Sequence, residues 1–131
     1  MKKSSESTNS VARTDCGEEG LAIREFLTKV GDKWTMLIVV SLSQMPGRRA
    51  RFSEIERVVP TISQRMLTLT LRSLERDGLI NREIFPEVPP RVEYELTEIG
   101  SSLLAPLQEL LDWFDNNWSD IKKARSKFEL R

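Results

Sequence analysis

A proline between two helix-start signals is the feature that most restricts how this chain can fold. Ser53 and Glu56 have the spacing of a capping box, in which the serine bonds the glutamate amide and the glutamate side chain bonds back. Pro60 ends the helix that begins there, because its ring blocks a further turn. Thr61 and Gln64 then repeat the capping pattern. Two capped helices joined by a proline turn predict a helix-turn-helix.

The second of these helices, expected from about Ile62 to Asp77, has two chemically different faces at 3.6 residues per turn. The apolar face holds Ile62, Met66, Leu67, Thr70, Leu71 and Leu74, and the polar face holds Gln64, Arg65, Thr68, Arg72, Glu75 and Arg76. The polar face is either an ordinary solvated surface or one that reads DNA, since glutamine pairs with adenine and arginine with guanine in the major groove. In the second interpretation the base-reading residues are Gln64, Arg65, Thr68 and Arg72, and Ser63 contacts a phosphate.

The segments on either side of this helix complete an order of elements. Apolar periodicity predicts helices at about Gly20–Val30 and Lys33–Met45, and residues 48–52 are long enough for one brief strand. Two strands are expected at residues 79–85 and 92–96, joined by a connection that holds three of the six prolines and ends in Arg91. This order predicts a mainly α fold with a small β-hairpin, the winged helix-turn-helix, in which Arg91, Lys33 and Arg51 add further contacts to DNA.

The last expected helix, about Glu98–Lys122 with Thr97 as its N-cap, carries a wide apolar stripe. The stripe includes Leu103, Leu107, Leu110, Trp113, Phe114 and Trp118. One small domain needs only one face of such a helix, so the width of the stripe predicts contact with a second copy of the chain in addition to core packing. The aromatic residues could instead line an effector pocket, but aromatic residues at helical spacing are more typical of a core or an interface.

Composition removes several classes of function. The 131 residues contain no histidine and one cysteine, so the commonest metal ligand and the commonest general base are missing. Without a phosphate-cradling glycine-rich loop or an acid-base pair, we expect no enzyme and no cofactor or metal site. No apolar run reaches the roughly 18 residues of a membrane span, and a lone cysteine suits a reducing compartment. We therefore expect a cytoplasmic protein without a membrane partner.

Charge and composition also vary along the chain. The formal net charge is zero, yet residues 48–91 hold nine basic and six acidic residues, so the middle of the chain is basic. Residues 1–15 are expected to be a disordered tail because they are polar and lack apolar periodicity. Residues 16–125 are expected to form a single domain that binds DNA and dimerises, followed by a frayed C-terminus at 126–131.

Several ordered motifs between residues 31 and 100 resemble the HxlR family of bacterial regulators. They are residues 31–34 (Gly-Asp-Lys-Trp), 51–55 (Arg-Phe-Ser-Glu-Ile), 62–68, 71–79 and 86–97. The resemblance implies a homodimer, related in fold to the MarR-type regulators, that binds an inverted-repeat operator in duplex DNA, and we expect a repressor. It also implies that the first and last helices form the dimer interface, which adds Leu21 and Phe26 to the interface residues. The alternative is a winged-helix module that binds proteins and not DNA.

Cys16 is the candidate redox sensor. Several members of the resembled family sense oxidants or electrophiles through a cysteine shortly before the first helix, and Cys16 lies eighteen residues before Trp34, somewhat further than is usual there. A sensor thiol requires an accessible, electropositive setting. Glu18 and Glu19 follow closely, and two carboxylates raise the pKa of a neighbouring thiol. Both an oxidant or small-molecule effector and an inert thiol therefore remain open.

Overall fold

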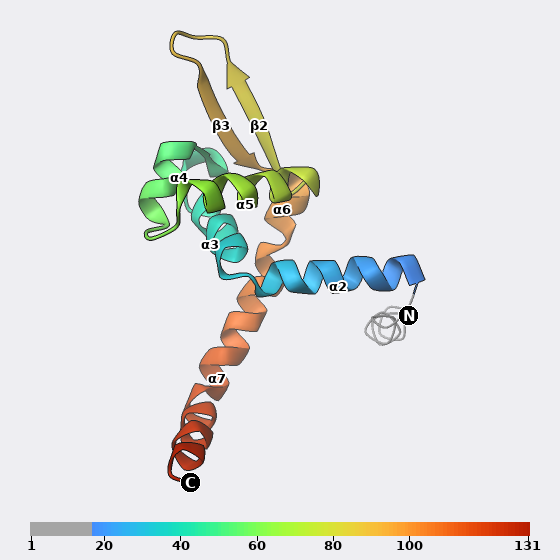
Figure 1. Ribbon diagram of the computed structural model, residues 1–131, viewed down its shortest axis with the longest axis vertical. Coiled ribbons are helices and arrows are strands. Elements are labelled where there is room, and N and C mark those ends of the chain that lie inside the picture. The colour runs from blue at the N-terminus through green and yellow to red at the C-terminus, as the bar shows by residue number, and fades with distance from the viewer. Residues whose placement is uncertain (1–16) are drawn as a thin grey trace.

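The structure, a computed structural model, describes residues 17–131 (Figure 1). The expected tail and Cys16 lie outside the described residues. In chain order the elements are α2 (Gly17–Gly31), α3 (Lys33–Ser43), the 3-10 helix η2 (Pro46–Arg48), β1 (Arg49–Arg51), α4 (Phe52–Val58), α5 (Gln64–Arg76), β2 (Ile80–Phe85), β3 (Arg91–Leu96), α6 (Glu98–Ser102) and α7 (Leu104–Glu129). This order confirms the expected mainly helical, winged architecture.

The three strands form one antiparallel sheet in the order β1-β3-β2. The brief strand β1 adds to the hairpin, with Ala50 opposite Tyr94 and Arg51 opposite Glu93. Beyond β1 the strands β2 and β3 continue as a two-stranded hairpin that projects from the helices (Figure 1). This projecting hairpin is the wing.

The core lies between α3, α4, α5 and the base of the sheet. Its most buried side chains, each at most 1% exposed, are Ile38, Val39, Leu42, Ile55, Leu67, Leu71, Leu74 and Ile80. Five of the six residues predicted on the apolar face of α5 are buried, and the exception is Met66, which is 39% exposed. Met66 lines a hollow between α5 and α2, so no helix covers it.

The start of α4 differs from the expected one. The carboxylate of Glu54 accepts a hydrogen bond from the Arg51 amide at 2.8 Å. This contact between a glutamate and the amide that precedes the helix was predicted for Ser53 and Glu56 and falls two residues earlier. Arg51 ends β1, and the side chain of Phe52 packs against the core. Sheet pairing and core packing therefore decide where this helix begins, and they override the local capping pattern.

The cap of α5 is Ser63 and not Thr61. The Ser63 hydroxyl accepts a hydrogen bond from the Met66 amide at 3.0 Å, whereas Thr61 adopts a φ of 72° inside the turn. At the other end, Gly78 has a φ of 75°, the left-handed conformation expected after the helix.

The expected last helix is divided into two. Thr97 caps α6 as predicted, since its hydroxyl accepts a hydrogen bond from the Gly100 amide at 3.0 Å. The helix is interrupted at Leu103, because Pro106 has no amide to bond the carbonyl one turn earlier. The second helix, α7, continues past Lys122 to Glu129, so most of the segment expected to be frayed is helical.

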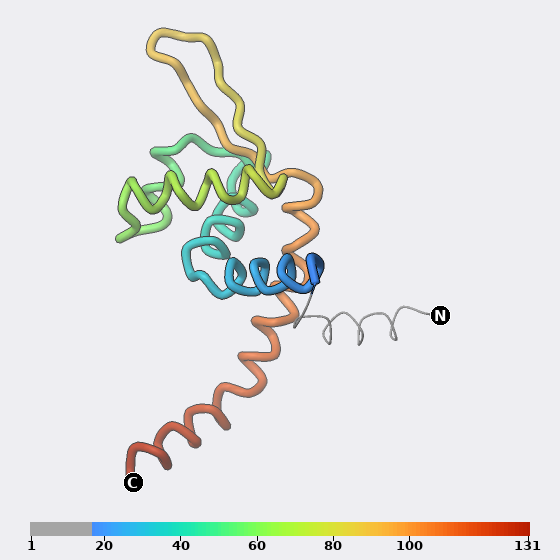
Figure 2. Tube along the Cα trace, turned by 45° about the vertical axis from the view of Figure 1, so that its right-hand side comes forward, coloured from blue at the N-terminus to red at the C-terminus, as the bar shows by residue number. Residues whose placement is uncertain are grey.

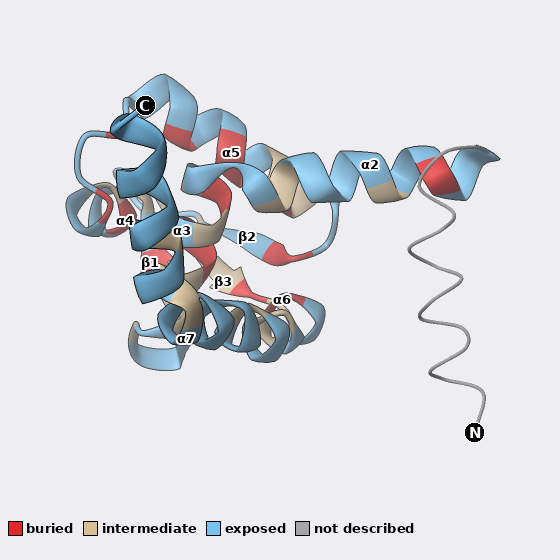
Figure 3. Ribbon diagram, turned by 90° about the horizontal axis from the view of Figure 1, so that it is seen from below, coloured by how far each residue is buried: buried red, intermediate tan, exposed pale blue. Residues whose placement is uncertain are grey.

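Two helices extend away from the core. Helix α7 has no buried residue, and in α2 only Gly20 is buried. Figure 2 shows α7 leaving the domain on the side away from the wing, and Figure 3 shows how little of either helix is covered. A single chain therefore leaves most of the surface of α2 and α7 open to solvent.

Candidate nucleic-acid interface

The polar face of α5 forms the candidate site. Leu67, Leu71 and Leu74 are fully buried or nearly so and hold the helix against the core. The residues predicted to contact DNA from this helix all point outward and are exposed, namely Ser63, Gln64, Arg65, Thr68 and Arg72. The first turns of α5, which carry most of these residues, follow the turn of the helix-turn-helix, where a recognition helix presents its base-reading end.

Two arginines lie on this face. Among residues 17–131, Arg65 and Arg72 form no ion pair and no hydrogen bond with other side chains. Their guanidinium groups can therefore donate to base edges or phosphates without breaking a contact inside the protein.

The arginine of the wing is in a different position. Arg91 begins β3 and pairs with Glu87 at 2.8 Å and with Glu93, and its guanidinium lies 3.9 Å from the centre of the Phe85 ring. The hydrogen bond from Arg91 lowers the pKa of Glu87 and raises the pKa of Arg91 itself. The connection between the strands therefore does not present the free cation that the sequence suggested.

One face of the sheet is acidic. Arg49 is surrounded by Glu83 at 2.6 Å, Glu93 at 2.9 Å and Glu95 at 3.2 Å. Arg51 shares this face, because it lies opposite Glu93 in the register and its charge lowers the pKa of Glu87. Arg51 and Arg91 are therefore on the side of the sheet opposite to Tyr94 and Ala50, among carboxylates, and apart from the polar face of α5.

The other face of the sheet brings a cation to α5 that sequence reasoning missed. Arg82 lies opposite Tyr94, and with Thr68, Arg72 and Glu75 these side chains line a cleft of about 180 Å³. Arg82 is 3.6 Å from Glu75, and burial raises the pKa of Tyr94. The period of two in a strand places Arg82 on the opposite face from Glu83, but only the register of the sheet shows that this face meets α5.

Lys33 lies beside the turn of the helix-turn-helix. It starts α3, its ammonium nitrogen is 4.6 Å from the centre of the Trp34 ring, and it lines a small cleft with Pro60 and Thr61. This position is next to the N-terminal end of α5, where a phosphate would lie against a docked helix. Lys33 thus lies near the start of α5, whereas Arg51 and Arg91 lie on the acidic face of the sheet.

The residues predicted for a dimer interface are largely uncovered. Exposed fractions are 61% for Leu21, 43% for Phe26, 55% for Leu110, 57% for Trp113, 43% for Phe114 and 36% for Trp118, while Leu103 and Leu107 are partly buried. The rings of Phe114 and Trp118 stack at 5.4 Å. So much exposed aromatic and aliphatic surface on two projecting helices is typical of a surface that a protein partner covers.

Helix-turn-helix, wing and exposed polar helix together define a winged helix-turn-helix protein. The family model for the HxlR-like helix-turn-helix matches residues 29–122. The chain therefore belongs to the HxlR-like family, which confirms the resemblance noted in the sequence. Its relatives are named HTH-type transcriptional regulators, so the family assigns the chain to HTH-type transcription regulation and implies DNA binding.

Similar sequences and solved structures agree with the assignment to transcription regulation. The chain is 53% identical over 87 residues to an uncharacterised HTH-type transcriptional regulator of Methanothermobacter thermautotrophicus, a match that covers 66% of this chain and 64% of that relative. It resembles the reduced form of the transcriptional regulator YodB from B. subtilis, with a TM-score of 0.63 and 36% identity over 76% of this chain and 91% of that one. It also resembles the redox regulator HypR in its oxidised form, with a TM-score of 0.59 and 40% identity over 73% and 96% of the two chains.

Two other features are absent from the described residues. Between residues 17 and 131 there is no group of three acidic, histidine or cysteine side chains arranged to hold a metal ion. In the same range no helix is both long and apolar enough to cross a membrane.

Proposed function

We propose that the protein is a homodimeric repressor that binds a specific inverted repeat in double-stranded DNA and places α5 of each copy in the major groove. The observation that carries this proposal is the exposed face of α5, where Arg65 and Arg72 form no ion pair and no hydrogen bond with another side chain of residues 17–131. Gln64 and Thr68 lie on the same face and complete a set of side chains that suits base edges.

The wing and the turn supply contacts to the DNA backbone in this proposal. Arg82 faces α5, so it replaces Arg91 as the wing cation that reaches the minor groove or a phosphate. Lys33 and Ser63 approach phosphates at the other end of α5. Arg51 and Arg91 stabilise the sheet through their acidic neighbours and contribute little to binding.

Dimerisation is supported by the uncovered stripe on α7 and α2. A symmetric dimer reads the same half-site twice, which makes the operator an inverted repeat with centres about 34 Å apart, one turn of DNA. A dimer that covers two successive major grooves blocks an overlapping promoter, and this is how we expect repression to arise. Because the relatives come from prokaryotes, whose DNA lies in the cytoplasm, we place the protein there.

The signal that releases the repressor is proposed to be an oxidant or a small molecule. The relative HypR is a redox regulator, and Cys16 is the only thiol of this chain. Replacement of Cys16 by serine tests this part separately: release of DNA on oxidation should disappear in Cys16→Ser. If oxidised wild-type protein and oxidised variant bind DNA equally well, Cys16 is not the sensor.

The experiment that tests the proposed function is selection of bound sequences from random duplexes, followed by footprinting on the selected site. We expect two inverted half-sites and an affinity that falls steeply with salt. The double variant Arg65→Ala with Arg72→Ala should enrich no sequence, whereas Lys123→Ala, an exposed cation on α7, should select the same site as wild type. If the wild type selects nothing, and gene regulation in cells survives the double substitution, the chain is a protein interaction module instead.

A further inference from the structure

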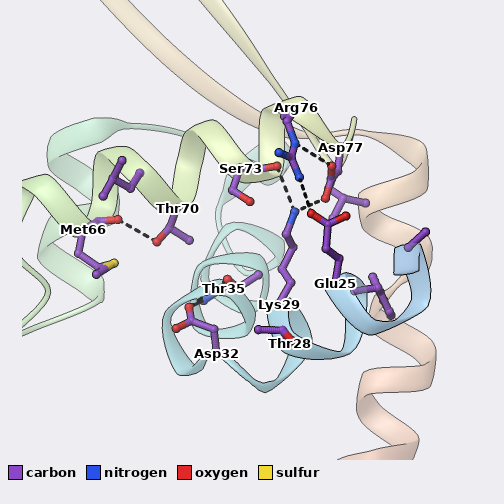
Figure 4. Close-up of a pocket in the computed structure, with 14 residues that line it drawn as sticks. Glu25, Thr28, Lys29, Asp32, Thr35, Met66, Thr70, Ser73, Arg76 and Asp77 are labelled. Carbon is purple, nitrogen blue, oxygen red and sulfur yellow. Dashed lines mark hydrogen bonds and ion pairs between the residues drawn. The ribbon is translucent and has the colours of Figure 1, made fainter. Parts of the chain in front are cut away.

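A polar bridge joins α2 to the C-terminal end of α5 (Figure 4). The Lys29 ammonium pairs with the Asp77 carboxylate and lies 3.4 Å from the carbonyl oxygen of Ser73. One turn earlier in α2, Glu25 lies 3.9 Å from Arg76. We call these five residues the α2–α5 bridge.

Lys29 is the central residue of the bridge. Its side chain is only 12% exposed, so water solvates the ammonium poorly and protein oxygens must replace the missing water. The last carbonyls of a helix carry partial negative charge, and the Ser73 carbonyl is one of them in α5. The Asp77 carboxylate adds a full negative charge beside the Lys29 ammonium, and hydrogen bonding to Lys29 lowers the pKa of Asp77.

Apolar packing does not fix α2 against α5. Between the two helices is a hollow of about 800 Å³, lined among others by Phe26, Met66 and Leu69. These three side chains remain 43%, 39% and 48% exposed, so they do not interlock. The α2–α5 bridge at one end of the hollow therefore holds these two helices together directly.

We infer that Lys29 is a positioning residue that sets the angle of the recognition helix relative to α2 and thereby selects the spacing between operator half-sites. The inference rests on the proposed function, in which α2 belongs to the dimer interface and α5 reads DNA. In such a dimer α2 is fixed near the two-fold axis, so the angle between α2 and α5 determines how far apart the two reading ends lie.

The length of α5 makes this angle important. A helix of 13 residues is about 20 Å long. The bridge holds its C-terminal end, while Gln64, Arg65 and Thr68 lie toward its N-terminal end. A tilt of about 10° at the bridge moves those side chains by about 3 Å, close to the 3.4 Å rise of one base pair. Loss of the bridge should therefore widen the range of half-site spacings that bind well by about one base pair.

The test measures binding to three kinds of duplex by fluorescence anisotropy: one half-site, the complete operator, and operators whose spacer is one base pair longer or shorter. The variants are Lys29→Met, which keeps the length of the side chain, Asp77→Asn, and the two combined. Lys123→Met is the control, because it removes an exposed lysine distant from the bridge. Circular dichroism and sedimentation establish that each variant is folded and dimeric.

We expect Lys29→Met to bind the complete operator about tenfold more weakly than wild type, within the usual range of coupling between sites, and to bind the half-site within about twofold of it. Its preference among the three spacers should flatten, and the double variant should be no worse than either single one. An unchanged spacer preference, or equal weakening on half-site and operator, would overturn the inference. If wild-type protein binds no duplex at all, the proposed function fails instead.

Discussion

Gly100 offers a sharp test of how the wing is anchored to the C-terminal helices. A Cβ atom at this position would lie 2.0 Å from the Leu79 carbonyl oxygen and 3.2 Å from a side-chain carbon of Leu96. The first contact is with backbone, which cannot move aside as a side chain can. Gly100→Ala must therefore displace the start of β2 or the whole of α6.

The cost can be assembled from three contributions. Overpacking of this kind costs about 1–3 kcal/mol. The Leu79 carbonyl also accepts a hydrogen bond from the Thr97 amide at 3.1 Å, and its loss costs about 1 kcal/mol. The better helix propensity of alanine returns about 1 kcal/mol. The net loss in the free energy of unfolding is about 2 kcal/mol, which lowers Tm by about 6–12 °C in a domain of this size.

Thermal unfolding followed by circular dichroism measures this loss, with all samples at one protein concentration because dimerisation makes Tm depend on concentration. Gly31→Ala is the matched control, since a Cβ there would meet no atom within 4 Å. The free energy of unfolding of Gly31→Ala should equal that of wild type or exceed it by up to about 1 kcal/mol. If Gly100→Ala is as stable as wild type, α6 does not approach the Leu79 carbonyl this closely.

Three further predictions concern the charges and the interface. Arg82→Ala should weaken binding to all DNA sequences alike and reduce the salt dependence of the affinity, whereas Arg91→Ala should change the affinity less than twofold. If a salt titration shows the larger losses in Arg91→Ala, Arg91 and not Arg82 is the wing contact. Because the pKa of Asp77 is lowered on folding, the stability that it contributes is present above its ordinary value of 3.8 and is lost as the pH falls through the folded pKa. Acid unfolding curves should show this contribution in wild type and a smaller one in Lys29→Met, where Arg76 alone still lowers the pKa of Asp77. Trp113→Ala should weaken dimerisation by about 30-fold or more, as expected for an aromatic hot spot, and a sedimentation profile that matches wild type would contradict the proposed interface.

Patterns with a local physical cause were predictable from the sequence. The buried leucines of α5 followed from periodicity, and the left-handed conformation of Gly78 followed from the need for a helix stop. The Thr97 cap is equally local, since its hydroxyl reaches an amide three residues away. Each of these features depends on residues close by in the chain, so a single sequence is enough to predict it.

Contacts between distant segments were not predictable. The capping box at Ser53 failed because the pairing of β1 with β3 fixes where α4 starts. Arg91 looked like a free cation because the sequence does not show that it folds against Phe85 between two glutamates. Arg82 was missed for the same reason, since only the register of the sheet places it beside Tyr94 and α5. Each case depends on tertiary pairing that local propensity does not encode.

Base reading by the exposed face of α5 is the core of the proposed function. Its most direct test is the affinity of wild type and Arg72→Ala for the selected operator and for operators altered one base pair at a time. We predict that Arg72→Ala loses about 1–3 kcal/mol on the selected operator and no longer discriminates at one position in each half-site. Equal weakening on every sequence, or no weakening at all, would contradict base reading by this helix.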